Sequence, residues 1–189
     1  GLGLTTVAPL LAPHPEVAGF AVVKTAEAIA LREAGITKPI LLLGLFAAAD
    51  GPLLAKHGIQ FSVWTDDAAA RIERAGKAAG VRPEAQLYLE TGMGRMGIPD
   101  HRAMPVIEDM DARALDVRGS FMGFTESDFD VEQLRRFREL TTAARESGAD
   151  LGTLHAASSH AVFNLAESHL DMVRPGIALF GAYPTNDDA

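Results

Sequence analysis

The chain has 189 residues, 48% of them hydrophobic and 22% charged, and it carries a formal net charge of −8. This composition is that of a folded globular chain, and the acidic balance excludes a nucleic-acid surface, because phosphate binding needs clustered Lys and Arg. The absence of cysteine excludes disulfides and thiolate metal sites and suits a reducing cytosol, and the apolar runs are too short to span a bilayer.

Short apolar runs alternate with helical patterns along the chain, and the first of these patterns predicts a helix at 5–11. Several runs are apolar at successive positions, as Leu41, Leu42 and Leu43 show, which is typical of strands covered on both faces in a parallel sheet. Seven strands are predicted, at 19–23, 40–43, 60–64, 86–90, 116–121, 150–155 and 171–180.

The helices between these strands are predicted from their end signals. Thr25 can cap a helix that stops at Gly35, and Thr65 or Asp66 can cap another that stops at Gly80. A further stripe at helical spacing consists of Val131, Leu134, Phe137, Leu140 and Ala144.

The densest basic spot lies on this last helix, at Arg135 and Arg136. Glu132 and Glu139 flank the two arginines at helical spacing. The pattern indicates a solvated helix face with paired charges, and not an anion site.

Strand and helix in strict alternation predict a parallel sheet with right-handed crossovers. Two α/β architectures fit this pattern, an open doubly wound sheet and a closed eight-stranded barrel. Seven predicted strands with a helix before the first favour a TIM-like (β/α)8 barrel that lacks its first strand. No linker, repeat or charge run divides the sequence, so residues 1–189 are predicted to form one incomplete barrel domain.

The segment 90–97, which reads ETGMGRMG, follows a predicted strand. Its three glycines leave the backbone open around Arg95, and active sites of barrels are built at the carboxyl ends of the strands. An ordinary glycine-rich turn with a surface arginine also fits these residues.

Two further segments stand at the ends of the last two predicted strands. Residues 155–159 read HAASS and place hydroxyls where a helix begins, which suits a phosphate, although a simple serine cap fits as well. Residues 173–177 read VRPGI, and Pro175 and Gly176 weaken a strand unless something approaches its backbone or a bulge forms there. Because barrels often bind phosphate at these two positions, the pattern predicts a phosphate-bearing ligand near two arginines.

These segments resemble the alanine racemase family, whose members are pyridoxal-phosphate enzymes of fold type III. Residues 91–97 (TGMGRMG) are similar to its T-G-M-G-R-hydrophobic-G signature, and 173–181 (VRPGIALFG) to its V-R-P-G-I-A-L-Y-G strand. Residues 155–159 resemble its H-x-x-N-S segment and 27–36 its E-A-x-x-L-R-x-A-G-I helix. Matches in the right order run from Gly1 to about Pro184, so the resemblance implies the N-terminal, cofactor-binding barrel domain.

The resemblance also implies roles for individual residues, with pyridoxal 5′-phosphate as the cofactor and no metal. Arg174 is expected to face the pyridine nitrogen, with His155 supporting its guanidinium. Arg95 is expected to donate to the phenolic oxygen of the ring and to lie near the substrate carboxylate, which makes it the catalytic residue of this chain. The phosphate is expected to be held by Ser159 and by the backbone N–H groups of Gly176 and Ile177.

The family's two proton-transfer groups are a lysine, which forms the Schiff base, and a tyrosine from the partner subunit. The lysine segment reads K-A-N-A-Y-G-x-G in the family, and Gly1, Leu2 and Gly3 match only its last three positions. The tyrosine belongs to a C-terminal β domain, which is expected beyond Ala189. The chain alone is therefore expected to be inactive, and Lys24 aligns with no catalytic position.

The chain departs from the family at four positions. Tyr88 stands where many members have a carbamylated lysine that steadies the arginine matching Arg95, and Gly123 stands where the family has a histidine stacked on the cofactor. Ser158 replaces an asparagine and Leu2 a common histidine.

The resemblance implies a cytoplasmic, homodimeric isomerase that converts L-alanine to D-alanine for peptidoglycan. Its partners are then a small amino acid and a second subunit, with no nucleic acid and no membrane. Two alternatives remain open, a racemase of another small amino acid and a non-catalytic homologue that binds pyridoxal phosphate. The departures at Tyr88 and Gly123 keep the first alternative in consideration.

Overall fold

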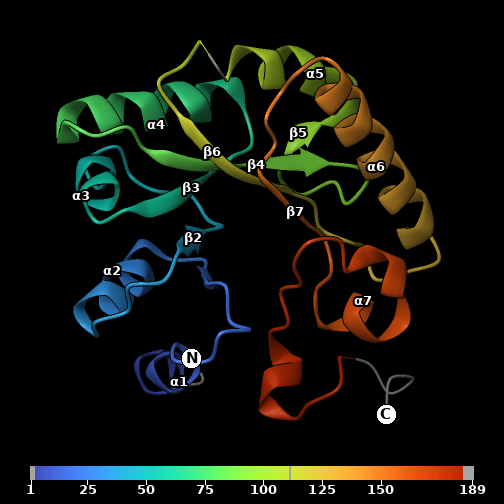
Figure 1. The fold of residues 1–189 in the computed structure, drawn as a ribbon, viewed down its shortest axis with the longest axis horizontal. Helices are drawn as coiled ribbons and strands as arrows, with labels where there is room; N and C mark the ends of the chain where they lie inside the picture. Colours follow the sequence, from blue (N-terminus) through green and yellow to red (C-terminus); the bar gives the residue numbers. More distant parts are fainter. Residues whose placement is uncertain (1–2, 111, 185–189) are drawn as a thin grey trace. The chain divides into compact units, whose positions relative to one another are not determined.

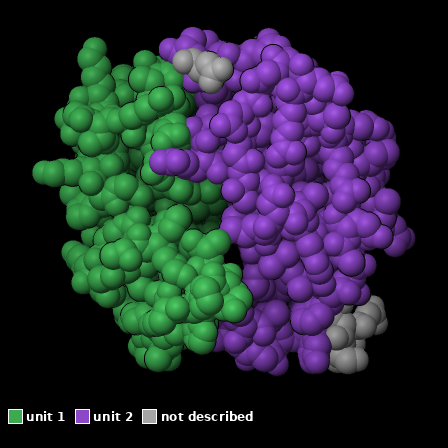
Figure 2. All heavy atoms as spheres, in the orientation of Figure 1, with its two compact units in different colours: residues 1–62, 66–86, 113–116 green, residues 63–65, 87–112, 117–189 purple. Residues whose placement is uncertain are grey.

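A computed structural model describes residues 3–110 and 112–184 of the chain (Figure 1). The chain divides into two compact units, which Figure 2 colours separately. Unit 1 comprises residues 1–62, 66–86 and 113–116, and unit 2 comprises residues 63–65, 87–112 and 117–189.

Unit 1 is built from strands and helices in alternation. Its strands follow the order β1-β2-β3-β4, and β1 pairs with β2, and β2 with β3, in parallel. Its elements are α1 (Leu4–Leu11), β1 (Phe20–Val22), α2 (Thr25–Glu33), β2 (Ile40–Leu42), α3 (Gly51–Lys56), most of β3 (Ile59–Val63), α4 (Asp66–Ala79) and the start of β4 (Glu84–Glu90).

The local sequence explains where the helices of unit 1 begin and end. α2 starts where the Glu27 carboxylate accepts a hydrogen bond of 3.0 Å from the Lys24 N–H, so Thr25 is the first helical residue and not the expected cap. The predicted stop at Gly35 and the stop of α4 at Gly80 are confirmed, and both glycines have a positive φ, 82° and 71°, that other residues rarely adopt.

Unit 2 continues the same alternation. Its strands follow the order β4-β6-β7, β5 pairs beside β4, and β6 pairs with β7 in parallel with Phe121 opposite His155. Its elements are the end of β4, β5 (Ile98–Pro99), α5 (Asp100–Asp109), most of β6 (Asp116–Phe121), α6 (Asp130–Glu146), β7 (Thr153–His155), α7 (Ser159–Asn164), and the 3-10 helices η1 (Ala166–Ser168) and η2 (Ile177–Phe180).

The apolar stripe of α6 is buried except at its first position. Leu134, Phe137 and two later residues of the stripe lie in the core, but Val131 is 65% exposed. At the start of the helix the polar residues Asp130 and Gln133 are buried instead. Their side-chain oxygens accept hydrogen bonds from Thr125, which satisfies them there.

The predicted strand at 171–180 is also wrong. Met172 forms a single parallel bridge with His155, and the chain then turns into η2. The segment cannot continue as a strand, because Pro175 has no N–H group to donate and the backbone of Gly176 is not extended (φ −110°, ψ −86°).

The other six predicted strands are present, and the predicted parallel α/β class is confirmed. The structure also contains α3, α5 and the two-residue strand β5, none of which was predicted from the sequence. No helix within the described residues is long and apolar enough to cross a membrane.

Candidate functional site

The guanidinium of Arg174 is held in a fixed position in unit 2. Its Nη1 donates to Nδ1 of His155, and its Nη2 donates to the carbonyl oxygens of Met122 (2.7 Å) and Ala156 (3.0 Å). Its Cζ atom also lies 5.3 Å from the ring centroid of Phe121. These contacts fix a cation at the carboxyl ends of β6 and β7, where parallel α/β proteins place their ligands.

His155 is neutral in this arrangement. Its side chain is fully buried at the end of β7, and burial, together with the positive charge of Arg174, lowers the pKa of His155 to about 2. Burial lowers the pKa of Arg174 to about 10, while its interaction with Tyr88 acts in the opposite direction. The pair therefore consists of a charged guanidinium and a neutral imidazole that accepts its hydrogen bond.

A second set of donors surrounds the hydroxyl oxygen of Ser159. The Ser159 side chain is buried, and its Oγ accepts hydrogen bonds from the backbone N–H groups of Gly176 (2.9 Å) and Ala178 (3.2 Å). The structure thus brings Ser159 and Gly176 together, and the second N–H that donates to the hydroxyl is that of Ala178. That Ser159, Gly176 and Ile177 hold a phosphate stays a prediction. Ser158 starts α7 without a side-chain cap and instead donates to the Glu126 carboxylate (3.2 Å).

Three stacked rings lie beneath Arg174. Tyr88 on β4 stacks on Phe121 of β6 with ring centroids 4.5 Å apart, and Phe121 stacks on His155 at 5.1 Å. The Tyr88 hydroxyl reaches the backbone of Gly123, because a Cβ atom on that glycine would lie 3.1 Å from it. Two of the four positions at which the chain departs from the family pattern, Tyr88 and Gly123, therefore lie beside each other.

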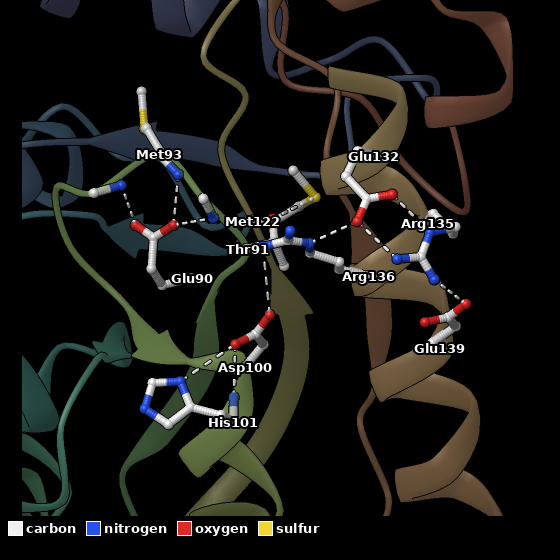
Figure 3. A network of polar contacts seen from close by, with 12 residues as sticks. Glu90, Thr91, Met93, Asp100, His101, Met122, Glu132, Arg135, Arg136 and Glu139 are labelled. Carbon is white, nitrogen blue, oxygen red and sulfur yellow. Dashed lines mark hydrogen bonds and ion pairs between the residues drawn. The ribbon is translucent and has the colours of Figure 1, made fainter. Parts of the chain in front are cut away.

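The Arg95 loop is organised by Glu90, whose role the sequence analysis missed. Figure 3 shows the Glu90 carboxylate pointing at the loop backbone, where it accepts hydrogen bonds from the N–H groups of Gly92, Met93 (2.5 Å), Gly94 (2.8 Å) and Arg95 (3.3 Å). An acidic residue directly before a glycine-rich loop was the available signal, because such a loop leaves several N–H groups without partners.

The side chain of Arg95 is exposed and makes no hydrogen bond or ion pair with the part of the chain that the structure describes. The structure therefore joins Arg174, His155, Ser159 and Gly176 by direct or adjacent contacts, but it records no contact between Arg95 and that group.

A pocket of about 230 Å³ lies beside this loop, lined among others by Glu90, Asp100, His101 and Arg136. Its carboxylates make it unsuited to a phosphate, and Arg136 is already shared between Asp100 (3.9 Å) and Glu132 (2.9 Å). Figure 3 also shows Arg135 between two glutamates on the outer face of α6, as the spacing predicted.

The donor set around Arg174 and Ser159 fits a phosphorylated ring. Arg174 provides a fixed positive charge beside a ring, and the Ser159 hydroxyl, which accepts from two backbone N–H groups, can itself donate to a phosphate. No cluster of His, Asp or Glu within the described ranges could hold a metal ion.

A family model described as the alanine racemase N-terminal domain matches residues 1–184. The chain belongs to the alanine racemase family. It is 33% identical over 173 residues to alanine racemase 1 of Caldanaerobacter subterraneus subsp. tengcongensis, covering 88% of this chain and 45% of that protein. It is 34% identical over 194 residues to the alanine racemase of Chlorobaculum tepidum, covering 98% of this chain and 50% of that protein.

The structure of alanine racemase from Clostridium difficile 630 superposes with a TM-score of 0.90 at 29% identity, over 97% of this chain and 49% of that one. The alanine racemase resemblance and the barrel-type fold predicted from the sequence are thereby confirmed. The chain spans about half the length of the curated relatives it matches. Gly1 and Leu2, which were compared with the family's lysine segment, lie outside the described residues.

Proposed function

We propose that the protein containing this chain is a pyridoxal-phosphate-dependent alanine racemase, and that this chain supplies the cofactor-binding part of its active site. The observation that carries the proposal is the placement of Arg174, which is fixed by His155 and two carbonyl oxygens beside the donors at Ser159. The relatives named alanine racemase support the choice of substrate.

Pyridoxal phosphate, when bound, supplies the electron sink that makes the α-proton of an amino acid removable. Ser159 and the N–H groups of the segment 176–178 would hold its phosphate. Arg174 would face the pyridine nitrogen, and because a neighbouring cation lowers the pKa of such a nitrogen, it would keep that nitrogen unprotonated. Neutral His155 assists by accepting a hydrogen bond from Arg174 without adding a charge.

Arg95 would bind the phenolic oxygen of the cofactor and approach the substrate carboxylate. The backbone of its loop is held in place, because the Glu90 carboxylate accepts hydrogen bonds from four N–H groups of the loop. The exposed guanidinium remains available for such contacts.

We further propose that residues 1–189 belong to one cofactor domain of a cytoplasmic homodimer that supplies D-alanine for peptidoglycan. The chain alone should be inactive, because no residue in it matches the Schiff-base lysine or the tyrosine. A racemase of another small amino acid is the second candidate, and the departures at Tyr88 and Gly123, which lie beside each other, favour it.

The test is to measure D-alanine formed from L-alanine by the full-length protein with pyridoxal phosphate, with serine supplied in a parallel reaction. Activity with alanine should fall at least about a hundredfold in Arg174→Ala, because a buried hydrogen-bonded charge is lost. Arg135→Ala, on the solvated face of α6, should retain full activity. Normal turnover in Arg174→Ala would contradict the proposed role, and the 189-residue chain should not exceed free pyridoxal phosphate.

A further inference from the structure

The hydroxyl group of Tyr88 is buried without a strong partner. Tyr88 is 5% exposed, and its ring is fixed by stacking on Phe121. The hydrogen bond recorded for its Oη within the described residues goes to the sulfur of Met93 at 3.9 Å. A thioether is a weak acceptor, whereas buried hydroxyls generally find a strong one. The hydroxyl therefore retains most of its capacity to donate a hydrogen bond.

Gly123 keeps this hydroxyl accessible. A Cβ atom at this position would lie 3.1 Å from Tyr88 Oη and 3.2 Å from the Met93 sulfur, so any side chain would press on both. The backbone is not free to retreat, because the buried side chain of Gln133 donates to the Gly123 carbonyl oxygen (3.2 Å). Gly123 itself is partly exposed. A ligand can thus approach the hydroxyl where a side chain would otherwise stand.

The hydroxyl belongs to the same site as Arg174. The carbonyl of Met122, directly before Gly123, accepts the 2.7 Å hydrogen bond from Arg174. Both the Tyr88 ring and the Arg174 guanidinium lie against the ring of Phe121, at 4.5 and 5.3 Å from its centroid. The phenol ring and the cation therefore both pack on Phe121, the last residue of β6.

We propose that Tyr88 is a further ligand-binding residue of this site, whose hydroxyl donates a hydrogen bond to an acceptor atom of the phosphorylated pyridine. The inference rests on the proposed function, which supplies the class of ligand. Met93 covers the hydroxyl until the ligand arrives, and its flexible side chain then moves aside.

The experiment measures binding of pyridoxine 5′-phosphate by equilibrium dialysis to the full-length protein that contains this chain, after its own cofactor has been removed. This compound has no aldehyde and cannot form a Schiff base with a surface lysine. Tyr88→Phe keeps the stacked ring and removes only the hydroxyl, and it should weaken binding about fivefold, which is typical of one lost hydrogen bond. Tyr183→Phe, at the only other tyrosine of the sequence, is the matched control and should bind normally.

Two more variants separate ligand contact from a structural role. Met93→Leu removes the sulfur but keeps the bulk, so it should leave binding unchanged if the hydroxyl serves the ligand. Gly123→Ala should weaken binding, and less so in the Tyr88→Phe background, because the 3.1 Å contact is then gone. Thermal unfolding of each variant, followed by circular dichroism, verifies that it folds.

The outcomes distinguish this inference from the proposed function. Equal binding by the unaltered protein and Tyr88→Phe would overturn the role of Tyr88 alone, as would an equal loss in Met93→Leu. Ser159→Ala tests the phosphate contacts independently of Tyr88. No binding by the unaltered protein, or no loss in Ser159→Ala, would overturn the cofactor site itself.

Discussion

His155 links the folding stability of the chain to pH through its contact with Arg174. Its pKa is about 2 in the folded chain against an ordinary value of 6.5, because burial and the adjacent guanidinium both oppose a second positive charge. Between these two values the unfolded chain binds more protons than the folded chain. The stabilisation is therefore complete above pH 6.5 and is lost progressively as the pH falls toward 2.

We expect the free energy of unfolding to drop by about 2 kcal/mol more in the unaltered chain than in His155→Gln when the pH is lowered from 7 to 5, since one proton contributes about 1.4 kcal/mol per pH unit. Urea denaturation at a series of pH values measures this difference. His101→Gln is the matched control, because the His101 side chain is 74% exposed. Identical pH slopes for His155→Gln and the unaltered chain would show that the histidine is not buried in its neutral form.

At the scale of the elements, sequence and structure agree where burial alone decides the outcome. β2 is buried at every position, and its continuous apolar run predicted it. β3 is also buried throughout, although Gln60 and Ser62 alternate with its apolar residues. The segment 171–180 is also rich in apolar residues, yet it forms a single β-bridge and a 3-10 helix and not a strand. There the backbone chemistry of Pro175 and Gly176 outweighs hydrophobicity, because a strand needs donors and extended angles at each residue.

In the candidate site, too, some residues could be predicted from the sequence and others could not. Arg174, Ser159 and His155 were found because they sit in short segments whose order matches a known family. The meeting of Tyr88 with Gly123 could not be found this way, because it depends on the relative register of β4 and β6 across 35 positions of sequence. The acceptor role of Glu90 is local, but it requires the loop conformation, which no residue pattern specified.

The conformation of the loop after β4 depends on the Glu90 carboxylate. Glu90→Ala should leave the N–H groups of Gly92, Met93 and Gly94 without their acceptor, so that water replaces it and the loop opens more readily. Hydrogen exchange followed by NMR should then be at least about tenfold faster at these amides. Glu139→Ala removes a glutamate that pairs with Arg135 on an exposed face and should leave the loop unchanged. Unaltered exchange in Glu90→Ala would mean that other contacts hold the loop.

At the scale of the whole molecule, the chain spans about half the length of the alanine racemases that it matches. Within the described residues β1 is hydrogen-bonded on one side only, to β2, and it leaves the backbone of its other edge unpaired. In unit 2, Ile177, Leu179, Phe180 and Tyr183 are all about half exposed.

We therefore expect the isolated 189-residue chain to self-associate. An unpaired parallel edge offers backbone groups to another chain, and an exposed apolar segment gains free energy when a second copy covers it. Size-exclusion chromatography with light scattering should detect dimers or larger species at micromolar concentration. Leu179→Glu combined with Phe180→Glu should reduce their proportion, because two carboxylates would have to be desolvated in the contact, whereas the same substitution at exposed Leu10 in α1 should not. A monodisperse monomer that unfolds cooperatively would contradict this expectation and would mean that the edge of β1 and the segment 177–183 are protected within the chain itself.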